Sequence, residues 1–600
     1  MNSKILIAFV LTLAALPSAR ATETENLNMQ VLPAQGTETP HVTVSAEGQD
    51  SIPKMELKKP FPKTTYLFRT DDAQLQATFD EALQKARGNI VLGKDNTRYM
   101  VEGAQYRHLW TETQPMGGNM FARHDLEIAV NNQMIFIETQ REDGRLVESV
   151  NDVTTSQYCR FTSFQGFCFP IEAFEVYYWL EKDKEFLRLL YQCFEKYDAY
   201  LWRFRDSNND GYLETWCAGD TGEDFTTRFA GGWSMHYWPY DVPPTTNNMV
   251  DERIVGKKEA EKKADYFRNN GKNSFPQESM DIMSYSYAAR DALALISREL
   301  NNGKEMGRKA DEVKKKIREY LWIPEKNACY DRGPDGKVVD ILIHNNLRCM
   351  YFGSFDQEMA GAFVKYYLLN PEEFWTATPL PSIAANDKFC DHNNISDNTW
   401  SGKPQGLTFQ RSIRALENYG HYAELTMIGE KLLKIVSESG NKFTPSFLID
   451  RAEADPVNVQ KGQVTYGPTI LSCLEFMTRL YGIHVTQGKV LWSGVSRTET
   501  VFCKQEWGER NYEMTREGNW IICSFNGKKI CRFTKGARVV TDLEGKFIEL
   551  IGIDYLPVPV QLKCGGSTVS LTVEPNVTYR YDDAGKISEW KRVPFNYGGR

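Results

Sequence analysis

Residues 217–229, CAGDTGEDFTTRF, combine the side chains that acid–base chemistry requires. Three carboxylates, Asp220, Glu223 and Asp224, lie within five positions, and Arg228 follows them. A carboxyl group serves as a general acid when burial or a neighbouring negative charge raises its pKa. The segment has neither a helix period nor a strand period. We therefore expect either a catalytic loop or an acidic turn capped by its own threonines.

Part of this loop resembles a known motif. Residues 221–229 resemble S-G-x-D-x-S-x-R-W of the (α/α)6-barrel glycosidases, which include trehalases (family 37) and processing α-glucosidases (family 63). Gly222, Asp224 and Arg228 are in register, while the first and last positions carry Thr and Phe in place of Ser and Trp. In those families the motif aspartate protonates the leaving oxygen, so the resemblance implies that Asp224 is the general acid. Arg228 is then expected to bind substrate or to brace the loop.

Further segments resemble the same families, in the same order along residues 65–485. Trp110 and Glu112 stand where those enzymes place a Trp-Asp pair that lines the sugar pocket, with Glu replacing Asp. We expect Trp110 to line the pocket and Glu112 to hydrogen-bond sugar hydroxyls. The other matching segments are residues 140–144, residues 165–170, and residues 400–402, which would place Trp400 in the substrate site.

An inverting glycosidase also needs a base, ~6.5–9.5 Å from the acid, that activates water. The related families place a glutamate shortly before the last barrel helix, but residues 443–456 have no glutamate at that position. Asp450 and Glu453 are the candidates, followed by Asp455. Asp450 is favoured because it follows an apolar stretch that would fix its backbone. The alternative is an acidic surface loop, with the base absent or elsewhere.

Residues 231–241 form an aromatic segment that contains Trp233, His236 and Trp238. Aromatic faces stack on sugar rings and histidine binds hydroxyl groups, so these three side chains are candidate substrate contacts. The alternative is a hydrophobic plug that closes the domain. Asp281 precedes a predicted helix and resembles a pocket-lining aspartate of the same families. It is otherwise explained as a negative charge that is favourable at a helix N-terminus.

Residues 206–211, DSNNDG, match the first half of a calcium-binding loop. Position twelve of that loop is Cys217 rather than a bidentate glutamate, which favours a polar turn. The sequence has no zinc-ligand cluster, phosphate-binding glycine loop or nucleophile elbow. We expect neither a metal nor a cofactor.

The elements that must hold these residues are mainly helical up to residue 487. Apolar residues recur at helical spacing, and from residue 488 the period changes to two, which predicts antiparallel strands. The fold expected is a mainly α chain with a helical domain at 59–487 and a small β-sandwich at 488–600. The resemblance implies an (α/α)6 barrel for the first domain. The predicted helices are residues 71–83, 125–139, 171–180, 185–200, 280–300, 309–321, 357–368, 407–419, 422–437 and 469–481.

The N-terminal residues indicate export. Residues 1–21 contain a lysine, a short apolar run and an A-x-A cleavage site, which is typical of a signal peptide. Residues 22–58 are rich in Thr, Glu, Pro and Gln and are expected to be a flexible lead-in. No later apolar run is long enough to span a membrane. We therefore expect a periplasmic or extracellular protein.

The composition of the chain argues against one class of ligand, nucleic acids, and suits another, carbohydrates. The net charge of -8 and the pI near 5.7 argue against nucleic-acid binding, which needs clustered basic surface. Aromatic residues make up 12% of the chain, which suits a carbohydrate ligand. The twelve cysteines have no paired spacing and are expected to be buried small hydrophobes. The oligomeric state is left open.

Together these features predict an exported glycoside hydrolase that cleaves terminal α-linked sugars with inversion, using Asp224 as acid and a residue of 450–455 as base. One alternative is a glycosidase or lyase on the same barrel that acts on rhamnose, arabinose or uronic acid linkages. The other is a glycan-binding relative that has lost its base.

Overall fold

The computed structural model describes Leu57 and residues 60–224, 226–229, 275–302, 306–392, 400–564, 566–582 and 585–595. The predicted signal peptide and, apart from Leu57, the predicted lead-in lie outside the described residues. The same is true of the three aromatic-segment candidates Trp233, His236 and Trp238. None of the described helices is both long enough and apolar enough to cross a membrane.

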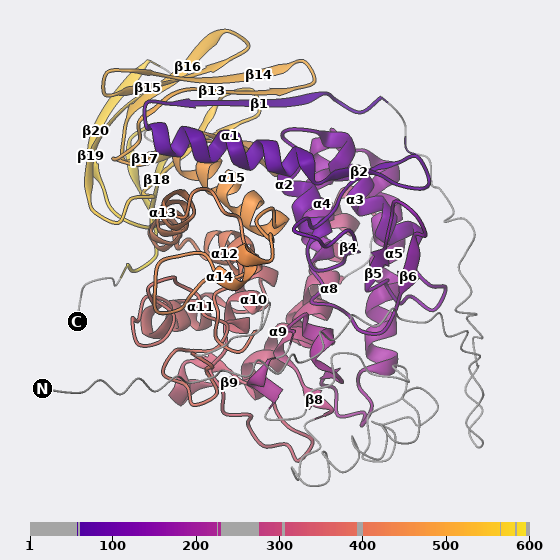
Figure 1. The fold of residues 1–600 in the computed structure, drawn as a ribbon. Helices are drawn as coiled ribbons and strands as arrows, with labels where there is room; N and C mark the ends of the chain where they lie inside the picture. Colours follow the sequence, from indigo (N-terminus) through magenta and orange to yellow (C-terminus); the bar gives the residue numbers. More distant parts are fainter. Residues whose placement is uncertain are drawn as a thin grey trace, which may run out of the picture. The chain divides into compact units, whose positions relative to one another are not determined.

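Six of the described helices contact one another in cyclic order (Figure 1). Each packs against the next, and the last packs against the first, so that their contacts form a ring. Their side chains are buried over most of the helix surface, as expected for helices surrounded by other elements. In ring order they are α2 (Gln114–Phe121), α4 (Phe169–Trp179), α8 (Met280–Leu300), α10 (Asn345–Phe352), α12 (Gly406–Glu417) and α15 (Gly467–Tyr481).

Other helices pack on the outside of this ring, and most of them keep one face exposed, whereas α3 (Leu126–Glu138) is buried along most of its length. In α5 (Lys184–Phe204), apolar residues recur at helical spacing and are buried against α8 and α4. Most of the charged residues between them in the sequence lie on the opposite, exposed face of the helix. The helix begins after Asp183, whose carboxylate accepts hydrogen bonds from the backbone N–H groups of Glu185 and Phe186. The other outer helices are α1 (Ala73–Gly88), α3 (Leu126–Glu138), α9 (Met306–Lys316), α11 (Gln357–Phe363) and α13 (Tyr422–Glu438).

The structure contains the ten predicted helices, some divided or with shifted ends, and adds others that the sequence did not indicate. Both α2 and α10 are ring helices of only eight residues and are buried on every side, so they show no amphipathic period. The predicted helices at 309–321 and 357–368 each end in a short π-helical segment. The remaining helical segments are α14 (Pro456–Gln460), η1 (Ala218–Thr221), η2 (Thr227–Phe229), η3 (Ile317–Leu321), η4 (Pro324–Lys326) and η5 (Val364–Leu368).

The C-terminal residues form two antiparallel sheets, shown in yellow and orange in Figure 1. The Trp492 and Tyr512 rings, one from each sheet, pack 6.1 Å apart. The seven-stranded sheet has the order β1 (Thr64–Thr70), β13 (Thr500–Trp507), β14 (Arg510–Glu517), β15 (Trp520–Phe525), β16 (Lys528–Thr534), β19 (Val558–Cys564) and β20 (Ser567–Val573). The six-stranded sheet has the order β11 (Ile483–Thr486), β12 (Lys489–Gly494), β17 (Ala537–Asp542), β18 (Phe547–Ile551), β21 (Val577–Tyr581) and β22 (Ile587–Arg592).

Two strands of these large sheets, β1 and β11, fall within the range predicted for the helical domain. β1 comes from the start of the described chain and pairs with β13, from Thr64 opposite Trp507 to Arg69 opposite Phe502. β11 pairs with β12. The sheets therefore begin before residue 488 and include a strand from the N-terminal part of the described chain. The sequence did not predict this, because pairing with a distant partner leaves no local signal.

Small sheets lie in the loops between the helices. They are β2 (Ile90–Leu92) with β3 (Arg98–Met100); β4 (Leu109–Trp110), β5 (Ser149–Asn151) and β6 (Tyr158–Arg160); β7 (Glu214–Thr215) with β8 (Gln277–Glu278); and β9 (Trp322–Ile323) with β10 (Ala328–Cys329).

Candidate active site

Several of the predicted site residues meet at the N-terminal ends of the ring helices. Glu112 lies just before α2, and the motif loop, residues 217–229, lies between α5 and α8. Trp400 precedes α12. Hydrogen bonds join these segments: Gln165, before α4, donates to Glu112, and the Trp400 backbone N–H donates to the Asp224 carbonyl at 2.9 Å. Loops far apart in the sequence thus form one site.

The conformation of the motif loop depends on its glycine. Gly222 follows η1 with φ +70°, a left-handed conformation that non-glycine residues rarely adopt. A Cβ atom at this position would lie 2.3 Å from the Glu112 carboxylate. Gly222 therefore lets the loop turn and lets Glu112 approach its backbone closely.

Two of the three loop carboxylates are held by arginines. Asp220 is buried and accepts hydrogen bonds from Arg205, at 2.6 Å, and from the backbone N–H groups of Phe164 and Trp216. Glu223 is buried and paired with Arg228. Although burial opposes ionisation, the nearby charge of Arg228 and a hydrogen bond with His344 keep the pKa of Glu223 below its usual value. Both carboxylates serve to fix the loop.

Asp224 differs from these two carboxylates. Burial raises its pKa to about 7, with Glu148 raising it further and Arg160 opposing the shift. A carboxyl group with such a pKa holds its proton in a substantial fraction of molecules at neutral pH, as a general acid must. Of the three carboxylates in the motif loop, Asp224 is therefore the one whose electrostatics suit proton donation.

Arg228 and Asp281 are buried and contact each other, with 2.9 Å between Nη2 and the carboxylate. Arg228 also pairs with Asp331, at 2.5 Å, and Asp281 accepts hydrogen bonds from Asn345 and Arg348. These contacts favour the loop-bracing interpretation of Arg228 over substrate binding. They give Asp281 the same role, because its carboxylate anchors α8 and α10 to the motif loop.

Glu112 and Arg411 lie beneath the motif loop. The Gln165 amide donates to Glu112 at 3.3 Å, and Arg411 lies 3.7 Å from the other carboxylate oxygen. Within the described residues, that second oxygen has no hydrogen-bond partner. Burial, opposed by Arg411 and assisted by Asp224, raises the pKa of Glu112 to about 8. A protonated Glu112 with an unoccupied acceptor suits hydrogen bonding to a polar ligand.

Glu102, which the sequence analysis did not single out, is buried beside the same cluster. Its backbone carbonyl accepts from the Gly467 N–H at 2.6 Å, and its carboxyl group is hydrogen-bonded to the Tyr466 phenol at the start of α15. Burial and the charge of Glu112 raise the pKa of Glu102 well above its usual value, Asp224 adds to the shift, and the hydrogen bond with Tyr466 opposes it. No motif marks Glu102, because only the approach of α15 brings it to the site.

The two predicted bases are on the surface. The side chains of Asp450 and Glu453 are 69% and 46% exposed, and both pair with Arg451, at 3.7 and 2.9 Å. The apolar stretch before Asp450 is largely buried, but the chain turns outward after it. Asp455 is buried, with Lys403 2.6 Å from its carboxylate. The local sequence could not distinguish an inward carboxylate from an outward one.

The two candidate substrate-binding tryptophans that the structure describes, Trp110 and Trp400, differ in what covers them. Trp110 is partly buried, and the Arg160 guanidinium lies over its ring, 5.0 Å from the centroid. Trp400 is buried and stacked on His344, with 5.4 Å between centroids. Trp400 therefore packs against the protein on one face, while Trp110 is covered by Arg160, whose charge lowers the pKa of Asp224.

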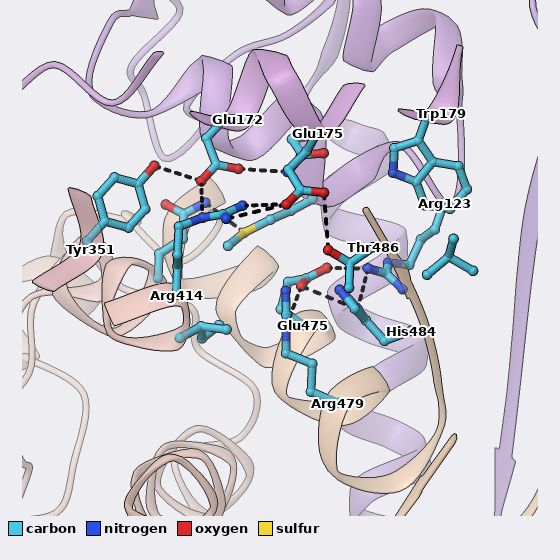
Figure 2. A pocket seen from close by; sticks show the side chains of 15 residues that line it. Arg123, Glu172, Glu175, Trp179, Tyr351, Arg414, Glu475, Arg479, His484 and Thr486 are labelled. Carbon is cyan, nitrogen blue, oxygen red and sulfur yellow. Dashed lines mark hydrogen bonds and ion pairs between the residues drawn. The ribbon is translucent and has the colours of Figure 1, made fainter. Parts of the chain in front are cut away.

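A separate cavity lies inside the helix ring (Figure 2). It is lined by ion pairs, including Arg414 with Glu172 and Glu175, and Arg123 with Glu475. Its free space of about 20 Å³ is room for one or two water molecules and not for a sugar. The ion pairs that line it connect α12 with α4 and connect Arg123, just after α2, with α15.

The segment that resembles a calcium loop forms a polar turn. The side chains of Asp206 and Asp210 accept hydrogen bonds from the backbone N–H groups of Gly211 and Tyr212. Among the described residues, no group of three or more His, Cys, Asp or Glu side chains is arranged to hold a metal ion.

The motif loop and most of the helical region match a known family of glycoside hydrolases. The model of the mannosylglycerate hydrolase MGH1-like glycoside hydrolase domain matches residues 106–444, more than half of the chain, including the whole motif loop. The chain belongs to this glycoside hydrolase family. It is a glycosidase, and the resemblance to family 63 enzymes is confirmed.

Solved complexes of one relative share the fold of this glycosidase. The GH63 mannosylglycerate hydrolase from Thermus thermophilus in complex with glucose is 15% identical, with 67% of this chain and 100% of that chain covered and a TM-score of 0.51. The structure of its complex with Tris and D-glycerate is 16% identical, with 68% of this chain and 100% of that chain covered and a TM-score of 0.50. A neutral trehalase from Saccharomyces cerevisiae is 13% identical over 65% of this chain and 76% of that chain, with a TM-score of 0.43. No curated protein matches the sequence.

Proposed function

We propose that this glycosidase is exported and removes terminal α-linked sugars within a closed (α/α)6 barrel. The cyclic contacts of the six ring helices support the barrel. The loops that gather at their N-terminal ends suit a pocket that holds the end of a glycan chain. Export is supported by the signal-like sequence of residues 1–21.

The proposal is carried by the position of Asp224, which is in register with the family motif and is buried so that its pKa is raised to about 7. Asp224 acts as the general acid and donates its proton to the glycosidic oxygen as the bond to the anomeric carbon breaks. Glu223 and Asp220 are poor alternatives, because each is held by an arginine.

Glu102 is the carboxylate that best suits the base. Glu102 is buried, and Asp224 is close enough to it to raise the pKa of Glu102. Asp450, by contrast, is exposed to solvent. Glu102 contacts the start of α15, and Asp224 lies on the loop before α8. In ring order α15 and α8 are three helices apart, on opposite sides. Glu102 and Asp224 thus come from different segments of the site, and the proposal requires that they face opposite sides of the sugar, as inversion demands.

In this mechanism the ionised Glu102 takes a proton from water as the water oxygen bonds to the anomeric carbon. The anomeric carbon loses its leaving group on the face opposite the incoming water, and its configuration inverts. Glu112 and Gln165 hydrogen-bond hydroxyl groups of the sugar. Because Glu102, Glu112 and Asp224 repel one another when charged, they ionise in succession. Since burial raises the pKa of Glu102 well above its usual value and that of Asp224 to about 7, the proposed roles require that bound substrate bring the pKa of Glu102 below that of Asp224.

The substrate proposed is a small α-hexoside. The solved relative with the same fold is a mannosylglycerate hydrolase, with complexes that contain glucose and D-glycerate. We extend the substrate class to this chain as an α-mannoside or α-glucoside with a short polar aglycone.

Substitution of the acid tests the first assignment. Asp224→Asn is expected to lower kcat on natural α-hexosides roughly 10²–10⁴-fold, because the amide cannot donate a catalytic proton. Binding of the sugar is retained, as measured by calorimetry. Hydrolysis of an α-glycosyl fluoride, whose leaving group needs little protonation, falls much less. If Asp224→Asn keeps full turnover on natural substrates, Asp224 is not the acid.

Substitution of the base gives a different pattern. Glu102→Gln is expected to lose hydrolysis of both the natural glycoside and the fluoride, because water is no longer activated. Asp450→Asn, on the surface, is the matched control and should stay within about twofold of the wild type. Loss of activity in Asp450→Asn but not in Glu102→Gln would return the base to residues 450–455.

The wild-type product distinguishes the remaining alternatives. Proton NMR of the first product should show the β-anomer from an α-glycoside. An unsaturated product would indicate a lyase. Binding without any product across α-hexosides, rhamnosides, arabinosides and uronides would indicate a glycan-binding protein without catalysis.

A further inference from the structure

Sulfur-containing side chains form a row across the seven-stranded sheet. Strand pairing places Cys503 opposite Met514, Met514 opposite Cys523, Cys523 opposite Cys531, and Cys531 opposite Cys564. Residues directly opposite each other on neighbouring strands share a face of the sheet. The cysteines had no paired spacing in the sequence, so only the strand register brings these sulfur atoms together.

Three thiols are adjacent at one end of this row. Cys523 and Cys531 are buried and Cys564 is half-buried. Interaction with the Cys523 thiol raises the pKa of Cys531, and interaction with the Cys564 thiol opposes that shift. Opposed residues of antiparallel strands have Cα atoms roughly 4.5–5.5 Å apart, within the range of about 4.4–6.8 Å found in disulfides. Each neighbouring pair therefore has a separation that a disulfide can span.

We infer that Cys531 and Cys564 are an oxidation site, at which a disulfide bond joins β16 to β19 under oxidising conditions. This inference is independent of the proposed catalytic function. Cys564 is the more accessible of the two neighbours of Cys531, because Cys523 is completely buried. The β16–β19 contact has three residue pairs, compared with seven between β19 and β20. A covalent bond here would strengthen the attachment of the β19–β20 hairpin to the sheet.

The reaction requires a small disulfide such as oxidised glutathione. The Cys564 thiolate attacks one glutathione sulfur, which forms a mixed disulfide and releases one glutathione thiolate. The Cys531 thiolate then attacks the Cys564 sulfur and releases the second glutathione. Two protein thiols are oxidised and one glutathione disulfide is reduced to two thiols. The thiol contact and burial raise the pKa of Cys564, so the reaction should be faster at alkaline pH.

Thiol counting tests the inference. The reduced full-length protein is incubated with oxidised glutathione at pH 8, denatured, and titrated for free thiols. The count is expected to fall from twelve by two, with a peptide that links Cys531 to Cys564 in the mass spectrum. The midpoint of thermal unfolding should rise by about 2–6 °C. A count that stays at twelve would overturn the inference.

Two variants identify the partner. Cys523→Ser removes the buried neighbour and should still lose two thiols, whereas Cys564→Ser should lose none. If Cys564→Ser loses two thiols and Cys523→Ser loses none, the bond joins Cys523 to Cys531 and the inference is wrong. Glycosidase activity of the oxidised and reduced protein is measured in parallel, and the thiol result stands whatever that activity is.

Discussion

At the scale of single residues, the charge environment separates carboxylates that the sequence presents as equals. Asp220 and Glu223 each form an ion pair with an arginine, whereas burial raises the pKa of Asp224 and favours its protonated state. The nearest opposing influence on Asp224 is Arg160, which also pairs with Glu148 and covers Trp110. The position of these charges sets the pH range in which the acid can work.

The pH dependence of kcat/KM follows from this environment. The general acid must be protonated, so kcat/KM is expected to fall as pH rises through about 7, the pKa of Asp224. Arg160 lowers that pKa, so Arg160→Gln should move the alkaline limb to higher pH. Arg188→Gln, at an exposed pair with Glu185, should leave it in place. Initial rates are measured from pH 5 to 9. If kcat/KM of Arg160→Gln falls at the same alkaline pH as that of the wild type, the assignment of Asp224 as the general acid is contradicted.

At the scale of elements, the ring helices bring loops together and the motif loop must fit among them. The loop reaches Glu112 through Gly222, reaches α10 through Glu223 and His344, at 3.2 Å, and reaches the segment before α12 through Trp400. A change in loop backbone conformation would therefore disturb several walls of the site at once.

Two glycines with nearly the same backbone conformation test this dependence. Gly222 has φ +70° and Gly440 has φ +71°, but only Gly222 has a neighbour within 4 Å of an added Cβ. Each substitution by alanine should lower the free energy of unfolding by about 1–2 kcal/mol, because of left-handed backbone strain. Gly222→Ala alone should also lower kcat/KM by roughly tenfold or more, because the Cβ displaces Glu112. Equal activity in the two variants would show that the close approach is unimportant.

At the scale of the whole molecule, ion pairs fasten the sheets to the helix ring. Arg538 on β17 donates to Glu417 at the end of α12, at 2.9 Å, and to the Arg479 carbonyl on α15. Arg479 also pairs with Glu417 and with Glu475, which lines the ring cavity in Figure 2. The C-terminal sheets thus close the end of the ring opposite the candidate site and contribute to its stability.

Removal of Arg538 tests this contribution. Arg538→Met keeps much of the side-chain volume but removes hydrogen bonds to a carboxylate and a carbonyl in a buried position. We expect the free energy of unfolding to fall by about 2–3 kcal/mol. Arg592→Met, at an exposed pair with Glu589, should change it by less than about 1 kcal/mol. Urea titrations followed by fluorescence measure both, and equal losses would contradict the role of Arg538.

The sequence by itself determined the features that depend on local pattern. The helical period located α5, α8 and α13, the change to a period of two located most strands of the two sheets, and residues 221–229 indicated the glycosidase family. These features were accessible because a period or a motif is contained within one short segment. The predicted catalytic role of Asp224 stays a prediction until the substitution is made.

The tertiary structure decided which distant residues meet. It placed Glu102 beside the start of α15, turned Asp450 outward, added β1 to the C-terminal sheet and aligned Cys531 with Cys564. No local pattern encodes these pairings, because each depends on the packing of segments far apart in the chain. Burial and neighbouring charge, which set the pKa values of Asp224 and Glu112, likewise exist only after that packing has formed.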